Sequence, residues 1–127
     1  MASNWLEEGN HAGAFIVSEA TQGATGVSRS REAVTYSGAT ALVAGQVVVL
    51  SAGAIVPYLN GTTSDANAIL FDNVDAGNTT TQNCVVLARD CEVNGAEIVF
   101  NSAETALTIA DAVAELAAVG IIVRETL

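Results

Sequence analysis

Short runs of apolar residues separated by polar turns dominate the chain from residue 33 onward. A run of this kind predicts a strand where it is rich in β-branched residues and bounded by Gly, Asn, Asp or Pro. The predicted strands are Ala33–Tyr36, Gln46–Leu50, Ala54–Val56, Ala68–Phe71, Asn83–Ala88 and Ile121–Val123. A turn is expected at Glu92–Glu97, followed by a short segment at Ile98–Phe100.

One segment near the C-terminus has the spacing of an amphipathic helix. Its predicted inward face is Ile109, Val113 and Leu116, and its predicted outward face is Asp111 and Glu115. Thr108 is the expected N-cap, with a start near Ala103 as the alternative, and Gly120 lies where a helix-ending glycine belongs. The pattern therefore predicts an α+β fold, dominated by β-structure, with one main C-terminal helix.

Residues 1–32 have a different composition, rich in Gly, Ser, Thr, Asn and Glu. Their apolar residues form two small groups, which are Trp5 and Leu6, then Phe15, Ile16 and Val17. Such a segment buries too little surface to offset its ordering entropy, so we predict an extended arm at 1–32 and a globular domain at 33–127. Trp is a favoured interface anchor, so Trp5 either docks onto a partner chain or folds back on its own domain.

Composition narrows the classes of function. The chain of 127 residues has 4 basic and 14 acidic residues, a net charge of −10 and no lysine. Nucleic acids and anionic membranes both attract cationic proteins, so neither is an expected partner. The absence of lysine also excludes Schiff-base, P-loop and lipoyl-carrier chemistry. Half of the residues are hydrophobic, which indicates that some apolar surface is buried against other subunits.

The nearly continuous apolar stretch Ala41–Leu59 is interpreted as two strands around a turn. Gly45, Gly53 and Pro57 interrupt it, and no Lys or Arg flanks it closely, so a membrane helix is disfavoured.

The two cysteines, Cys84 and Cys91, have opposite parity if a strand begins near Cys84, so their side chains would point to opposite faces. Free buried thiols are therefore favoured over a disulfide or a metal pair.

No catalytic, cofactor or metal-binding constellation stands out. His11 is the single histidine and lies in the predicted arm, without the rigid frame that catalysis requires. Asp72 and Asp75 could contact calcium, but their spacing does not match an EF-hand, and a solvated turn is favoured. A small hydrolase using Asp90 or Glu97 is the least favoured of the functions considered.

Arg89 and Arg124 each end an apolar strand. They could form surface ion pairs within the chain or bidentate salt bridges across a subunit interface, and the sequence leaves both open.

Five segments occur in a characteristic order, namely residues 11–19 (HAGAFIVSE), 28–32 (SRSRE), 43–47 (VAGQV), 85–97 (VVLARDCEVNGAE) and 116–124 (LAAVGIIVR). Together they resemble the head-decoration protein family of tailed bacteriophages, typified by the decoration protein of phage lambda. The match is to the bacterial-prophage branch of the family. The chain departs from it at Ala14, where relatives often carry an acidic residue.

The resemblance implies a compact mixed α/β domain and a structural role. Made in the host cytoplasm, the protein would bind as a homotrimer to the major capsid protein, at local three-fold axes on the outer surface of the expanded head. There it would stabilise the capsid against the pressure of packaged DNA. The arm residues that would contact the capsid by adding a strand to a sheet edge are Trp5, Leu6, Phe15, Ile16 and Val17. The alternative is another oligomeric virion module, in the tail, the baseplate or a host-surface adhesin.

Overall fold

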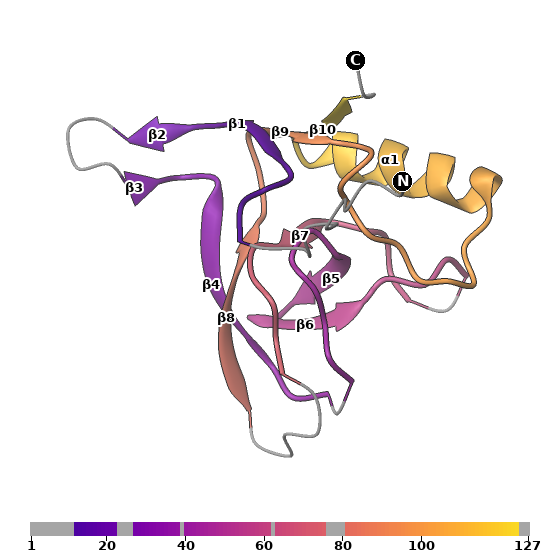
Figure 1. Ribbon diagram of the computed structural model, residues 1–127, viewed down its shortest axis with the longest axis horizontal. Helices are drawn as coiled ribbons and strands as arrows, with labels where there is room; N and C mark the ends of the chain where they lie inside the picture. Colours follow the sequence, from indigo (N-terminus) through magenta and orange to yellow (C-terminus); the bar gives the residue numbers. More distant parts are fainter. Residues whose placement is uncertain (1–11, 23–26, 39, 62, 76–80, 125–127) are drawn as a thin grey trace, which may run out of the picture.

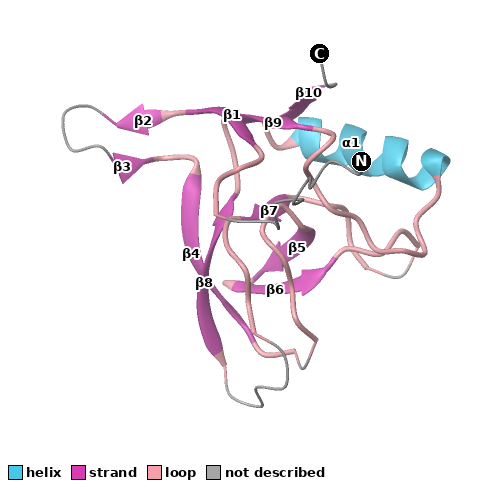
Figure 2. Ribbon diagram, viewed as in Figure 1, coloured by secondary structure: helices cyan, strands magenta, loops and turns pink. Residues whose placement is uncertain are grey.

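A closed five-stranded barrel is the largest unit of the fold (Figures 1 and 2). The computed structural model describes residues 12–22, 27–38, 40–61, 63–75 and 81–124. The barrel strands are β4 (Arg31–Tyr36), β5 (Val47–Ser51), β6 (Ala54–Pro57), β7 (Ala68–Leu70) and β8 (Gln82–Leu87), in the order β4-β6-β5-β7-β8. Neighbours are antiparallel except β4 and β6, which are parallel and close the barrel through the Thr35–Ala54 pair.

Side chains from all five strands fill the barrel interior. Two loop residues, Leu42 and Val74, complete this cluster. Its members are Val34, Tyr36, Leu42, Val48, Ile55, Ala68, Leu70, Val74 and Val86. Residues of the opposite parity on β5, β7 and β8, among them Val47, Val49 and Ile69, belong to a second buried cluster outside the barrel. Successive strand residues point to opposite faces, so a strand buried on both faces appears in sequence as a continuous apolar run.

A second layer covers the outer side of the barrel at β5, β7 and β8. It consists of α1 (Ala106–Ala118) and a three-stranded sheet of β1 (Ile16–Glu19), β9 (Cys91–Asn94) and β10 (Ile121–Arg124), in the order β1-β9-β10. β9 is antiparallel to β1 and parallel to β10, and α1 supplies the crossover that parallel pairing requires. The second core cluster fills the space between the layers, where Phe15, Val93 and Leu116 meet Ile69 and Leu87.

A short hairpin connects this layer to the barrel. It consists of β2 (Thr21–Gln22) and β3 (Val27–Ser28), which pair antiparallel and extend away from both sheets (Figure 1). The hairpin follows β1 directly and leads into β4, so its base lies where the two layers of the fold meet.

The expected N-cap of α1 is wrong by three residues. Thr105 caps the helix, and Thr108 is its third residue. The two threonines form a reciprocal capping box, in which Thr108 Oγ1 accepts a hydrogen bond from Thr105 N at 2.7 Å and Thr105 Oγ1 accepts one from Thr108 N at 3.5 Å. The predicted helix end is confirmed, since Gly120 has φ 86° just after the C-cap.

The two faces of α1 follow the predicted pattern only in part, because Leu116 of the predicted inward face is buried whereas Ile109 and Val113 are half-buried. Ala112 and Leu116 are buried, and Asp111 is exposed. Glu115 does not face solvent as expected, because its carboxylate accepts a hydrogen bond from Ala66 N at 2.8 Å. The backbone of the loop before β7 is thus hydrogen-bonded to the helix.

The predicted strands are confirmed to within about two residues at their ends. The turn expected at Glu92–Glu97 is wrong in its first half, where β9 continues to Asn94 and the turn occupies residues 95–97. Cys91 and Val93 are buried while Glu92 and Asn94 are half-buried, so β9 has the alternation of a strand that the Asn-Gly turn signal obscured. Ile98–Phe100 contributes only a single bridge, between Gln46 and Val99.

Both cysteines are free, as the parity argument predicts. Cys84 packs at the edge of the barrel-interior cluster, and Cys91 is buried in the cluster between the layers. Burial raises the pKa of Cys91 to about 11, so its thiol stays protonated and unreactive at neutral pH.

Candidate functional site

The base of the predicted arm is attached to the domain by Phe15 and β1. The Phe15 side chain lies in the core between the layers, only 2% exposed, and its carbonyl accepts a hydrogen bond from Asn94 N at 2.8 Å. Gly13 makes the preceding turn with φ 74°, and an added Cβ there would lie 3.2 Å from the Phe71 ring. β1 then pairs with β9 through a bulge between Ile16 and Ser18. Residues 15–19 are therefore packed as part of the folded domain.

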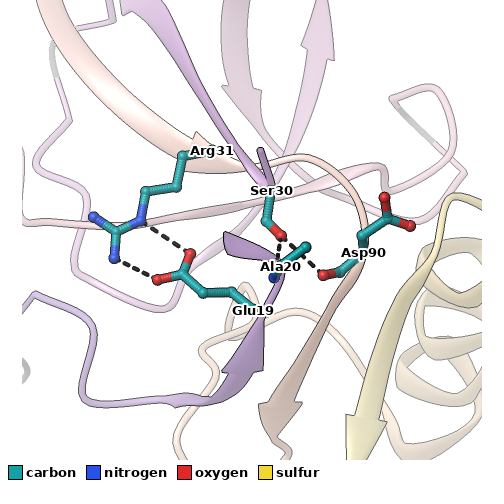
Figure 3. A network of polar contacts seen from close by, with 5 residues as sticks. All are labelled: Glu19, Ala20, Ser30, Arg31 and Asp90. Atoms are coloured by element: carbon teal, nitrogen blue, oxygen red, sulfur yellow. Dashed lines mark hydrogen bonds and ion pairs between the residues drawn. The ribbon is translucent and has the colours of Figure 1, made fainter. Parts of the chain in front are cut away.

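A buried serine ties the end of β1 to two other segments of the chain (Figure 3). Ser30 is fully buried, accepts a hydrogen bond from Ala20 N at 2.9 Å and donates one to the Asp90 carbonyl at 2.8 Å. Ala20 N also lies 3.2 Å from that carbonyl. Asp90 has φ 49°, a left-handed conformation that turns the chain between β8 and β9. Ser30 thus joins the ends of β1, β3 and β8 through the backbone N–H of Ala20 and the carbonyl of Asp90.

Arg31 clamps the same junction from outside. Its guanidinium binds both carboxylate oxygens of Glu19, with Nε–Oε2 at 3.0 Å and NH2–Oε1 at 2.6 Å (Figure 3). The guanidinium also lies 4.1 Å above the centre of the Phe71 ring. Hydrogen bonding to Glu19 raises the pKa of Arg31, an effect that burial partly opposes. Glu19 ends β1 and Arg31 begins β4, so this pair links the three-stranded sheet to the barrel.

The five residues assigned to capsid contact fall into different environments. Trp5 and Leu6 lie outside the described residues. Phe15 is in the core and Ile16 is half-buried against it. Val17, 55% exposed, is the one described member of the five that presents a large apolar side chain to solvent.

Arg89 and Arg124 both have partners within the chain. Arg89 binds Glu32, with NH2–Oε2 at 2.6 Å, and donates to the Arg29 carbonyl at 2.8 Å. Arg124 binds Glu92, with Nε–Oε1 at 3.1 Å, and hydrogen bonds from Arg124 and Ser18 lower the pKa of Glu92. These pairs join β4 to the β8–β9 turn and β9 to β10.

Of the residues considered for catalysis, Asp90 makes structural contacts within the domain. Asp90 gives its carbonyl to the Ser30 network, and its carboxylate lies 3.8 Å from Arg29. Glu97 is exposed in the turn after β9, and His11 lies outside the described residues. Within the described ranges, no three His, Cys, Asp or Glu side chains gather as a metal site would require. Among the helices of those same ranges, none is long and apolar enough to cross a membrane.

The family described as bacteriophage lambda head decoration protein D matches residues 5–121, nearly the whole chain. The chain belongs to this family. No curated protein and no solved structure gives a significant match.

Membership confirms the predicted family and makes the protein a structural component of the phage virion, located in the capsid and associated with it. The family is one of structural proteins, not enzymes. In a head decoration protein the exposed surfaces that contact other chains take the place of an active site. The geometry around β1 matters because it sets where the chain enters the domain.

The network around Ser30 was missed in the sequence, although the segments that carried the family resemblance contain it. Ser30 lies in residues 28–32, and Asp90 lies in residues 85–97. The partners of Ser30 are 10 and 60 residues away along the chain, so no local spacing reveals them. A lone serine between two arginines has no pattern that predicts full burial.

Proposed function

We propose that this protein binds as a homotrimer at local three-fold axes of the expanded phage head and stabilises the head against the pressure of packaged DNA. The observation that carries the proposal is the family match over residues 5–121. The high proportion of hydrophobic residues supports self-association, because half of the sequence is apolar in a chain of only 127 residues.

The arm is the proposed capsid-binding element, and the major capsid protein is its partner. Strand addition to a capsid sheet edge uses main-chain hydrogen bonds for affinity and side-chain pockets for specificity. In this arrangement the buried Phe15 anchors the arm to its own domain. The remaining apolar arm residues, Trp5, Leu6 and the exposed Val17, make the contacts with the capsid, while Ile16 supports the anchor.

Neither nucleic acid nor membrane is a proposed partner. Each of the four arginines already pairs with a carboxylate of its own chain. The net charge of −10 repels packaged DNA and anionic lipid. The ion pairs Arg89–Glu32 and Arg124–Glu92 are proposed to hold the domain together and not to bridge subunits.

Binding to expanded, undecorated phage heads tests the proposal directly. The mass of the free protein and the number of copies bound per head are measured together. A free trimer that saturates at three copies per local three-fold site is expected. A protein that ignores heads but labels tails in electron micrographs of virions would contradict decoration and favour the tail or baseplate alternative.

A truncated protein of residues 12–127 separates arm binding from folding. It retains Phe15 and β1, so a folded domain with strongly reduced head binding is expected. Val17→Ser and Val56→Ser form a matched pair for finer testing, because both valines lie in strands and are 55% and 50% exposed. We expect Val17→Ser to weaken head binding and Val56→Ser to leave it unchanged. Full binding by the truncated protein would rule out the arm as the docking element.

A further inference from the structure

Two Asn-Gly pairs occur in the chain, and the structure places them in opposite environments. They are Asn60–Gly61, between β6 and β7, and Asn94–Gly95, at the end of β9. Asparagine followed by glycine is the dipeptide most prone to spontaneous loss of the side-chain amide, because glycine has no Cβ to hinder attack by its own backbone nitrogen on the asparagine Cγ. Neither pair belongs to the residues proposed to contact the capsid.

The attacking nitrogen of the second pair is held in the sheet. Gly95 N donates a hydrogen bond to the Arg124 carbonyl at 2.7 Å, and a Cβ added at Gly95 would lie 3.0 Å from the same oxygen. The Asn94 side chain is held as well, since its Oδ1 accepts a hydrogen bond from Ala96 N at 3.0 Å. Attack at Asn94 therefore requires the ends of β9 and β10 to separate locally.

The attacking nitrogen of the first pair is free within the part of the chain that the structure describes. Gly61 is exposed, has φ 77°, and a Cβ added there would meet no described atom within 4 Å. Its N–H has no hydrogen-bond acceptor among the described residues. The pair lies in a turn closed by a hydrogen bond from Thr63 N to the Leu59 carbonyl at 3.0 Å, so no strands have to separate.

One side-chain hydrogen bond holds the amide of Asn60. Its Nδ2 donates to the hydroxyl of Tyr58 at 3.0 Å, and Tyr58 is 2% exposed. Burial raises the pKa of the Tyr58 hydroxyl, and hydrogen bonding with Asn60 opposes this effect. The carboxylates of Glu115 and Glu104 raise the pKa further, so both lie near the Asn60 amide. For Asn60 Cγ to turn toward Gly61 N, only the bond to Tyr58 must break, which is a smaller opening than parting two strands.

We propose that Asn60 is a site of spontaneous covalent modification, at which Gly61 N bonds to Asn60 Cγ and closes a cyclic succinimide. Nδ2 leaves as ammonia and takes the proton that Gly61 N gives up. Water then opens the ring at either carbonyl, which leaves aspartate or isoaspartate in place of Asn60. Water is the only co-reactant, and the pairing of β9 and β10 protects Asn94 from the same reaction. The modification is independent of the proposed head binding.

The product loosens the contact between this turn and the helical region. The segment between β6 and β7 lies close to the start of α1 (Figure 1), where Glu104 accepts the hydrogen bond from Asn60 N at 2.7 Å. Glu115 on α1 accepts the one from Ala66 N, so both ends of the segment are bonded to this region. A carboxylate in place of the Asn60 amide loses the donor to Tyr58 and adds a negative charge beside two others.

Peptide mapping of the full chain by mass spectrometry tests the proposal. The folded protein is incubated at mildly alkaline pH, which favours removal of the proton from the attacking nitrogen, and conversion is followed at both Asn-Gly pairs. Each rate is divided by the rate of the same pair in urea, where the fold is absent. We expect this ratio to be at least about tenfold higher for Asn60 than for Asn94, because Asn94 reacts only from locally opened molecules. Equal ratios, or conversion of Asn60 in urea but not in the folded protein, would overturn the proposal.

Two variants of Asn60 separate the reaction from its consequence. Asn60→Gln keeps the amide but requires a larger, more slowly formed ring, so conversion at this position should be lost. Asn60→Asp imitates one product and should lower amide-exchange protection at Asp-substituted position 60 and at Ala66, while β4 and β8 keep theirs. Asn94→Asp is the matched control, because it retains the oxygen that accepts from Ala96 N. Wild-type protection at Ala66 in Asn60→Asp would overturn the loosening of the turn.

Discussion

In the barrel, the side chains that hold the strands together are almost all aliphatic, whereas at the junction of β1, β3 and β8 they are Ser, Glu, Arg and Asp. Tyr36 is the exception in the barrel interior, and its hydroxyl donates to the Thr40 carbonyl at 2.8 Å. Around that junction, Ser30 is fully buried, and Arg29, Arg31 and Arg89 pair with carboxylates. The two regions share strands β4 and β8, so the contrast lies in the side chains and not in the backbone.

This difference separates the contacts that stabilise the domain from the contacts that fix the relative positions of its strands. Apolar burial is non-directional and scales with area, so the barrel core supplies most of the stability without by itself fixing the position of β1. Hydrogen bonds and exposed ion pairs contribute little net free energy but require a defined geometry. The polar network therefore fixes the end of β1 relative to β4 and to the turn between β8 and β9.

Phe15 belongs to the arm in sequence and to the core in structure, so its removal gives the largest expected effect. Phe15→Ala should lower the free energy of unfolding by about 3–5 kcal/mol, because it empties a buried site between the layers. Val17→Ala, two residues away and exposed, should change it by less than about 0.5 kcal/mol. Urea denaturation measures both. Equal, small effects would mean that the arm base is not part of the cooperative core.

Ser30→Ala tests the buried polar network. It removes two hydrogen bonds, the one accepted from Ala20 N and the one donated to the Asp90 carbonyl, and should cost about 1–3 kcal/mol. Ser18→Ala is the control, since the Ser18 hydroxyl is exposed and bonds only to the surface carboxylate of Glu92 in the described contacts. If both substitutions cost the same in denaturant titrations, burial of Ser30 has no special role.

Arg31→Lys keeps the charge but loses the bidentate geometry and the stacking on Phe71. We expect a loss of about 1 kcal/mol or less, because the pair is partly exposed, and a larger proportional loss in amide-exchange protection at β1 than in the barrel. Arg89→Lys is the matched control for a pair that does not touch β1. Uniform loss of protection across the domain would contradict a positioning role.

Substitution of Glu92 has the smallest expected effect, and this effect is on the pH dependence of stability. Hydrogen bonds from Arg124 and Ser18 lower the pKa of Glu92 in the folded protein. A carboxylate with a depressed folded pKa adds stability above its unfolded pKa and loses it as pH falls through the folded value. Glu92→Gln should therefore flatten the decline in stability below about pH 4 and leave the barrel unaffected. A wild-type acid profile in the variant, measured by thermal unfolding from pH 2 to 7, would exclude this contribution.

The strands of the barrel were predictable because their signal is local. Val47, Val48 and Val49 form a β-branched run ended by turn residues, and both faces of that run are buried. The helix was predictable for the same reason, and its start was misplaced because Thr105 and Thr108 are both capping residues in one motif. β1 was missed and β9 was predicted as a turn, because each is short and is a strand through pairing with distant segments, β1 with β9 and β9 with both β1 and β10.

The sequence by itself determined the class of fold, the family, the acidic and lysine-free surface, and the expectation of free thiols. Each follows from composition, short-range periodicity or an ordered set of motifs. Only the tertiary structure decided that Phe15 is a core residue, that Ser30 is buried, and that all four arginines pair within the chain. Those contacts join residues far apart in sequence. Their existence depends on how the barrel and the three-stranded sheet are brought together, which no local pattern encodes.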